Sequence, residues 1–199
     1  MLESKIWDRI KFHLFYKHYY AKTFKSYGRD IRWGRDFAFF CIPHTVRVSC
    51  PQLITIGDHC QFDDGVYLQC HWQGEGIDIA SGVRINAHTH ILSYSKIVIE
   101  KKVLIAPFCL IASGNHGVPI GEQAIMDCPH RPSGEIVIGT GTWLGHGATI
   151  LGGVSLAPQI TVASRAVVTK SFVQSKIVLG GIPARQLSLS IQSSETIND

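Results

Sequence analysis

The chain has 199 residues, of which 19 are Lys or Arg, 15 are Asp or Glu and 45% are hydrophobic. This apolar content with a low net charge excludes an intrinsically disordered chain, and the length suits one domain of moderate size. It contains 24 Ile and 14 Val but only 13 Leu, which favours β-strands over a helical bundle.

The first segment, residues 1–35, holds the surplus of positive charge. It contains nine Lys or Arg and three Asp or Glu, a net charge of 9 − 3 = +6, whereas residues 36–199 carry 10 − 12 = −2. Ile6, Ile10 and Leu14 follow helical spacing among aromatic residues, so this segment is predicted to be a basic helix. Such a helix either packs on the protein with a solvated basic face or lies on an anionic membrane surface.

The sequence shows no export signal and no span of a bilayer. Charges interrupt the first 14 residues, and the longest apolar run, 103–112, is short and contains Pro107. The six cysteines form no C-x-x-C pair, and reduced thiols are expected in a chain without an export signal. We therefore expect a cytoplasmic protein, at the inner face of a membrane if segment 1–35 binds lipid.

From Ile56 onward the sequence has a repeat with a period of six. Four residues after each opening aliphatic the side chain is usually small or β-branched, as at Cys60, Val83 and Thr89. This period predicts a three-sided solenoid in which each short strand starts a new face and each 18-residue coil stacks on the next. Five sets are found (56–73, 79–96, 99–116, 138–155 and 156–173), with opening residues Ile56, Phe62, Leu68, Ile79, Ile85, Ile91, Ile99, Ile105, Ile111, Ile138, Leu144, Ile150, Leu156, Val162 and Val168.

Three insertions separate these sets, at 74–78, 97–98 and 117–137. The first two are interpreted as corner adjustments. The third is a 21-residue excursion, and long insertions in solenoids often build the binding site. The expected organisation is therefore a basic helical segment 1–35, a β-helix domain 36–178 with the long loop 117–137, and a C-terminal segment 179–199.

Four motifs give the sequence a family resemblance. They are IASGNHGVP (111–119), EIVIGTGTWLGHGATILGGV (135–154), VASRAVVTKSF (162–172) and LGGIPARQL (179–187). With the repeat, residues of about 40–187 resemble the hexapeptide-repeat acyltransferases, especially the O-acetyltransferases of sugars such as maltose, galactosides, capsule and lipopolysaccharide. The resemblance implies an all-β solenoid, a left-handed parallel β-helix, contrary to the usual right-handed crossover. It also implies a short C-terminal helix and a homotrimer with its sites between subunits.

Acetyl transfer from a thioester to a hydroxyl needs a base, donors for the oxyanion, and two substrates held together. Histidine suits the first task, and the resemblance assigns the general base to His116. It also implies that Asn86 contacts the acceptor. Ser113 and Asn115 are further candidates for acceptor binding, to orient His116 or supply donors. Glu122 and Asp127 are candidates for a carboxylate that orients His116, and the sequence does not choose between them.

The resemblance places the acetyl-CoA site on the last coils. Basic groups there suit the phosphates of the coenzyme. No metal is expected. The residues that match the family's coenzyme positions are Trp143, Gly145, Ser164, Thr169, Lys170 and Arg185.

Three other functions compete with O-acetylation of a sugar or polysaccharide precursor. An N-acetyltransferase acting on an amino sugar would share the solenoid, but its usual N-terminal nucleotide-binding unit has no G-x-G-x-x-G signature here. A γ-class carbonic anhydrase would need three converging His, yet His71, His116 and His130 are scattered in the sequence. A non-catalytic β-helix scaffold would not need the His116 motif. No nucleic-acid partner is expected, because no recognition motif accompanies the modest charge.

Overall fold

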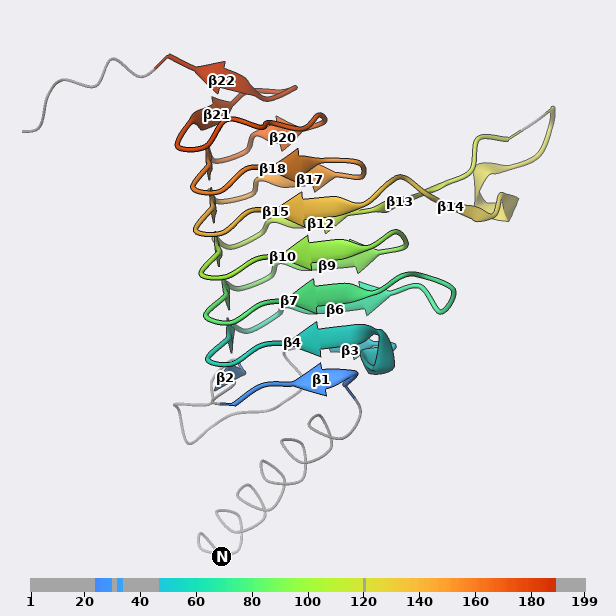
Figure 1. Cartoon of the computed structure of the whole chain (residues 1–199). Helices are drawn as coiled ribbons and strands as arrows, with labels where there is room; N and C mark the ends of the chain where they lie inside the picture. Colours follow the sequence, from blue (N-terminus) through green and yellow to red (C-terminus); the bar gives the residue numbers. More distant parts are fainter. Residues whose placement is uncertain (1–23, 30–31, 34–46, 120, 189–199) are drawn as a thin grey trace, which may run out of the picture.

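The computed structural model describes residues 24–29, 32–33, 47–119 and 121–188. In these ranges the chain is a stack of triangular coils (Figure 1). Sheet A contains β1 (Ser26–Tyr27), β4 (Ile54–Ile56), β7 (Ile77–Ile79), β10 (Ile97–Ile99), β15 (Ile136–Ile138) and β18 (Ser155–Leu156). Sheet B contains β2 (Arg32–Trp33), β5 (Gln61–Phe62), β8 (Arg84–Ile85), β11 (Leu104–Ile105), β16 (Trp143–Leu144), β19 (Thr161–Val162), β21 (Val178–Gly180) and β22 (Arg185–Leu187). Sheet C contains β3 (Arg47–Ser49), β6 (Tyr67–Cys70), β9 (His90–Ser93), β12 (Leu110–Ala112), β17 (Thr149–Leu151) and β20 (Val167–Val168).

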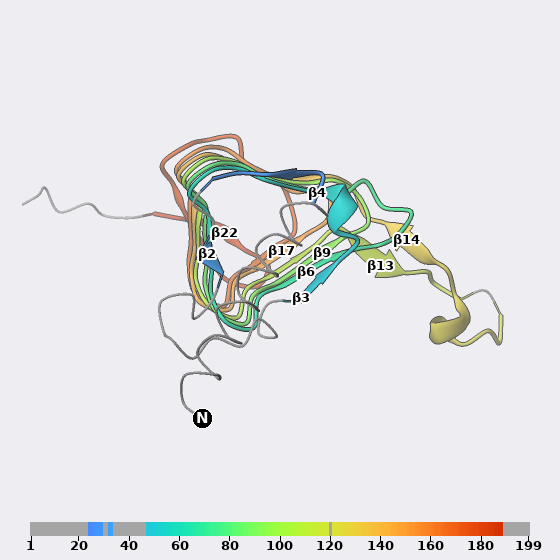
Figure 2. The same cartoon turned by 90° about the horizontal axis from the view of Figure 1, so that it is seen from below.

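The chain passes from sheet A to B to C and back to A in every complete coil. Seen from the N-terminal end, it turns anticlockwise as it recedes, which is the left-handed sense expected (Figure 2). Neighbouring coils pair in parallel and in register, so that Ile97 lies between Ile77 and Ile136 on the adjacent strands. The predicted left-handed parallel β-helix is therefore confirmed.

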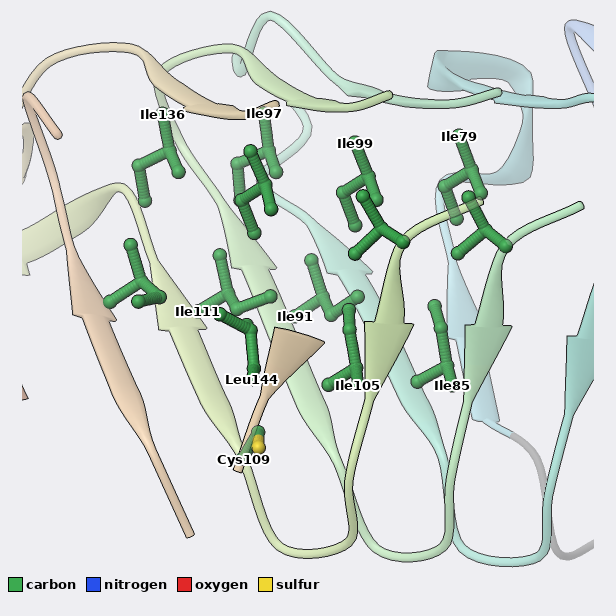
Figure 3. Packing of buried hydrophobic residues seen from close by; sticks show 14 of the residues in the cluster. Ile79, Ile85, Ile91, Ile97, Ile99, Ile105, Cys109, Ile111, Ile136 and Leu144 are labelled. Atoms are coloured by element: carbon green, nitrogen blue, oxygen red, sulfur yellow. The ribbon is translucent and has the colours of Figure 1, made fainter. Parts of the chain in front are cut away.

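The core is the inside of this triangle. All fifteen opening residues of the predicted hexapeptides are at most 2% exposed, and they stack in columns of identical or similar side chains (Figure 3). The small positions Cys60, Val83, Thr89 and Cys109 are buried as well. β-branched Ile suits such columns because its limited rotamer freedom fits an extended backbone.

The strands of sheet A explain three wrong boundaries in the predicted repeat. The repeat leaves Ile77 and Ile97 in the insertions 74–78 and 97–98, but each begins a strand and is fully buried. In each strand both Ile residues face inward, because side chains two positions apart share one side of a strand. Ile136, which the repeat leaves at the end of the long loop, starts β15 for the same reason.

The described parts of both end segments form strands. Within segment 1–35, Tyr27 of β1 pairs with Ile56 and Trp33 of β2 pairs with Phe62, so the hexapeptide spacing already begins in this segment. Residues 1–23 of the predicted helix lie outside the described ranges, in which no helix is long and apolar enough to span a bilayer. At the other end, β21 and β22 pair in antiparallel fashion where the C-terminal segment was expected to be helical, and 189–199 lie outside the description.

The long excursion leaves the solenoid where sheet C passes to sheet A, which we call the C–A corner. It opens as a two-stranded antiparallel hairpin of β13 (Gly114–His116) and β14 (His130–Pro132), and a short 3-10 helix, Ile125–Asp127, lies beyond the hairpin. Figures 1 and 2 show this hairpin as an arm projecting from the triangle. A short 3-10 helix, Pro51–Leu53, also precedes β4. The arm positions the side chains of the cleft described next.

Candidate functional site

A cleft of about 410 Å³ lies at the C–A corner, between the base of the hairpin and the coils below it. Two strands of sheet C, the turn after β9 and both hairpin strands contribute to its walls. Its lining combines imidazole and phenol rings with amide groups, and contains no Asp, Glu, Lys or Arg. The lining residues are Gln69, His71, Leu92, Ser93, Tyr94, Gly114, Asn115, His116 and His130.

His116, the predicted general base, ends β13 with an exposed ring that borders the cleft. It lies opposite His130 in the hairpin register. The two Nε2 atoms are 3.2 Å apart, and the ring centroids are 4.2 Å apart at an angle of 71°. Gly114 lets the start of β13 pass close to the turn after β9, since a Cβ there would lie 2.6 Å from the Cβ of Tyr94.

A row of aromatic rings continues from the histidine pair along the wall of the cleft. The edge of His71 meets His130 at 5.6 Å between centroids. The face of His71 stacks on Tyr94 with 4.5 Å between ring centroids. The Trp72 ring is tilted relative to His71, and the centroids of these two rings are 5.8 Å apart. Trp72 itself is 72% exposed, which is high for such a large apolar side chain.

The predicted acceptor-binding residues are not all in this cleft. Asn115 lines it and is exposed. Ser113 is fully buried: its hydroxyl donates to the carbonyl of Ser95 at 2.6 Å and accepts from the Tyr94 backbone N–H at 3.1 Å. It therefore ties the hairpin base to the preceding coil. Asn86 follows β8 where sheet B passes to sheet C, the B–C corner.

The predicted coenzyme residues gather mainly away from the cleft. Trp143 is 47% exposed on β16 of sheet B, and Gly145 follows it at the B–C corner, in the same column as Asn86. A Cβ on Gly145 would lie 2.7 Å from the backbone nitrogen of Ser164, so glycine is required for the two coils to approach. Ser164 is exposed at this corner of the next coil.

Three further coenzyme candidates lie on the last coils. Thr169 and Lys170 follow β20, and Arg185 begins β22; all are exposed. The Lys170 ammonium lies 5.6 Å from the centre of the Phe172 ring, a cation–π contact that is compatible with an exposed charge. Within one chain, the structure thus brings Trp143, Gly145 and Ser164 together at the B–C corner and keeps them apart from His116.

The described residues contain no group of three His, Cys, Asp or Glu placed to hold a metal ion. His71, His116 and His130, which are far apart in the sequence, do meet, but as a row of rings. The buried thiols are unsuited to metal binding, because burial raises the pKa of Cys70 to about 12 and that of Cys109 to about 11. Burial also raises the pKa of Cys60.

Sequence reasoning misses His130, His71 and Tyr94 as cleft residues. All three stand outside the hexapeptide register or at its outer positions, so the period carries no information on them. One signal was present for His130. If the excursion opens as a hairpin, a residue near its end must face His116 near its start.

No family model matches the chain. In sequence it is similar to WbbJ of Escherichia coli (strain K12), a provisionally assigned lipopolysaccharide biosynthesis O-acetyl transferase, with 31% identity over 184 residues that cover 82% of this chain and 91% of WbbJ. A chloramphenicol acetyltransferase of Morganella morganii is 28% identical over 116 residues, or 47% of this chain and 54% of that protein.

Solved structures share the fold. AntD, an N-acyltransferase from Bacillus cereus in complex with dTDP and 3-hydroxybutyryl-CoA, matches with a TM-score of 0.69 and 15% identity, covering 86% of this chain and 86% of AntD. A maltose O-acetyltransferase from Clostridium difficile 630 matches with a TM-score of 0.56 and 20% identity, over 86% of this chain and 72% of that one.

Proposed function

We propose a reaction for this chain from the premise that it belongs to the hexapeptide-repeat acetyltransferases: it transfers an acetyl group from acetyl-CoA to a hydroxyl of a sugar or of a surface-polysaccharide precursor. The observation that carries the proposal is the position of His116. Its ring stands inside the matching sequence motif and at the edge of a cleft whose lining contains no Asp, Glu, Lys or Arg.

In this reaction His116 takes the proton of the acceptor hydroxyl while the oxygen attacks the thioester carbon. A tetrahedral oxyanion forms and then collapses, the carbon–sulfur bond breaks, and the proton passes to the departing sulfur of coenzyme A. Asn115, an exposed amide that lines the cleft next to His116 in the sequence, would donate a hydrogen bond to the acceptor or to the oxyanion.

The test is acetyl-CoA turnover with candidate sugars by the wild type and by His116→Ala. We expect kcat to fall about 10²- to 10⁴-fold in the variant, because proton transfer has lost its base, with coenzyme affinity unchanged in calorimetry. His59→Asn, distant from the cleft, serves as the control and should turn over normally. Unchanged turnover by His116→Ala would remove this histidine from the mechanism.

The separation of the two half-sites supports a trimer in which the cleft of one chain faces the B–C corner of the next. That corner and the adjacent face of sheet B expose three large apolar side chains: Leu104 (38%), Phe108 (57%) and Trp143 (47%). Exposed apolar groups of this kind are typical of an interaction surface.

In the trimer Trp143, Gly145 and Ser164 would line the pantetheine arm. Thr169, Lys170 and Arg185 would lie near the nucleotide end of the coenzyme, and the two basic side chains suit its phosphates.

An amine of an amino sugar is the second candidate acceptor, favoured by the likeness to the N-acyltransferase AntD. Mild alkali distinguishes the two products, because it hydrolyses an acetyl ester and leaves an acetamide intact. We expect the label from radioactive acetyl-CoA to be released by alkali. Retention of the label would favour N-acylation.

We also propose that the enzyme works in the cytoplasm, at the inner face of the membrane, through the basic segment 1–35. The net charge of +6 in this segment, against −2 in the remainder, supports the proposal. Sedimentation with anionic vesicles tests it. The full chain should sediment, and a chain lacking residues 1–23 should not.

A further inference from the structure

The ring of His116 has one hydrogen-bond partner among the described residues, and that partner is His130 at 3.2 Å. We propose that His130 is the positioning residue of the reaction: it fixes the orientation of His116 and stabilises the cation that forms when His116 accepts the acceptor proton. The inference rests on the proposed function and names a part of its machinery that the family resemblance did not supply.

The carboxylates do not compete for this role in the structure. Glu122 and Asp127 are exposed on the loop beyond the hairpin, and within the described ranges no hydrogen bond or ion pair joins either of them to His116. The Gln123 side chain donates to Asp127 at 3.0 Å, but to its backbone carbonyl and not to its carboxylate. The imidazole of His130 thus occupies the place in which a carboxylate orienter was expected.

His130 is itself held on two sides, as an orienting group must be. The β13–β14 pairing fixes its backbone opposite His116. The edge-to-face contact with His71, which in turn stacks on Tyr94, fixes its ring. The pair therefore depends on the folded hairpin and on two coils of the solenoid together.

In the neutral pair one Nε2–H donates to the other Nε2; when His116 is the donor, its Nδ1 is free to accept a proton. As the new carbon–oxygen bond forms, the hydroxyl proton moves to Nδ1, and the Nε2–H bond to His130 becomes charge-assisted. As the carbon–sulfur bond breaks, the proton leaves Nδ1 for the sulfur. His130 gains and loses no proton in the cycle.

The experiment replaces His130 in two ways. His130→Gln keeps a hydrogen-bond acceptor at the end of the side chain, whereas His130→Phe keeps the ring against His71 but has no nitrogen. Arg131→Gln, on the same strand, is the matched control for disturbance of the hairpin. We expect kcat to fall about 10- to 100-fold in His130→Phe with little change in either KM, and to recover largely in His130→Gln.

The pH profile separates positioning from packing. In His130→Phe the cationic form of His116 has lost its hydrogen-bond acceptor, so the acidic limb of kcat/KM should move to lower pH. The other titratable or charged groups close to the pair are His71 in the turn after β6, Tyr94 after β9 and Arg131 on β14, and all remain in the variant. Equal losses in the Phe and Gln variants with an unmoved acidic limb would overturn the proposal, as would normal turnover by His130→Phe.

A second readout needs no turnover and so separates this inference from the proposed function. Nitrogen-15 NMR of the histidine side chains should show one protonated Nε2 shared by the pair and an unprotonated Nδ1 on His116, with this tautomer preference reduced in His130→Phe. An unaltered His116 spectrum in the variant would reject the pair even if the enzyme acetylates sugars. The expected spectrum in a protein that fails to turn over acetyl-CoA would instead count against the proposed function alone.

Discussion

At the residue scale, isoleucine dominates the core because each inward side chain must favour the extended backbone of a strand and must also pack against the matching side chains of the coils on either side. Ile97 pairs with Ile77 below and Ile136 above, and all three are fully buried. A branched Cβ restricts χ1 and fills space close to the backbone, which suits a strand of only two or three residues. This local requirement produces the excess of Ile over Leu in the composition.

The buried thiols predict a pH dependence of stability. Folding raises the pKa of Cys109 from the ordinary 9.0 to about 11 through burial, so the unfolded chain loses this proton at lower pH than the folded one. The resulting stabilisation is complete below about pH 9 and is lost as the pH rises toward 11. We expect the free energy of unfolding in urea to fall between about pH 9 and pH 11, and less steeply in Cys109→Ala.

Lys and Tyr side chains also titrate in this interval, so the wild-type slope by itself is not diagnostic. The difference in slope between wild type and Cys109→Ala isolates the thiol. Parallel curves for the two proteins would show that Cys109 does not titrate differently on unfolding.

At the scale of elements, the two long departures from the regular coil lie at the C–A corner. Residues 71–76 form an extended turn after β6, and the 114–135 excursion follows β12 at the same corner two coils later. The turns at the other two corners between β4 and β12 are short. Function-building segments therefore lie on one edge of a regular scaffold, which keeps the repeat intact.

Trp72, on the extended turn 71–76, should form an outer part of the acceptor site. A pyranose ring has an apolar face of C–H groups that can stack on an exposed indole, and Trp72 continues the ring row from His71. We expect Trp72→Ala to raise the KM for a glycan acceptor about 2- to 10-fold without changing kcat, since the indole lies away from the reacting atoms.

Two variants make this measurement specific. Trp72→Phe should retain most of the affinity, because it keeps an aromatic face. Gln73→Ala on the same turn should behave as the wild type. An unchanged acceptor KM in Trp72→Ala would contradict the assignment.

The sequence predicted the elements of the five regular coils because the period of six is itself the packing rule. It missed the final coil because the spacing changes there: Leu156 aligns with Phe172, sixteen residues on, and Val162 with Leu179, seventeen on. The motif identifies His116 but not His130. The two residues face each other across an antiparallel hairpin, where the sequence separation of paired residues changes from pair to pair and depends on the length of the loop, so no constant period relates them. One chain places Asn86, Trp143, Gly145 and Ser164 at the B–C corner, apart from His116, whereas Thr169 and Lys170 follow a strand of sheet C. The resemblance implies a site shared between subunits, and the arrangement in a single chain leaves the roles of these residues as predictions.

At the scale of the whole molecule, a single chain keeps His116 and the predicted coenzyme residues Trp143, Gly145 and Ser164 on different edges, so under the proposed function activity should require assembly. Three chains of 22.0 kDa give about 66 kDa, which is the mass we expect in light scattering. Leu104→Arg places a charge on the exposed face of sheet B and should yield a 22.0 kDa species without turnover. Lys102→Glu, on an outward corner, should remain trimeric, and an active monomer would refute the shared site.

The antiparallel strand β22 has a consequence for solubility. Parallel ladders end in unpaired backbone groups that could recruit the open end of another molecule and grow into a fibre. At the described C-terminal end of sheet B, β22 reverses direction, is only three residues long and begins with the charged Arg185. The first strand of a second solenoid would meet β22 running in the opposite direction to the other strands of sheet B, so it could not continue the parallel ladder. We therefore expect β22 to limit end-to-end polymerisation of the solenoid.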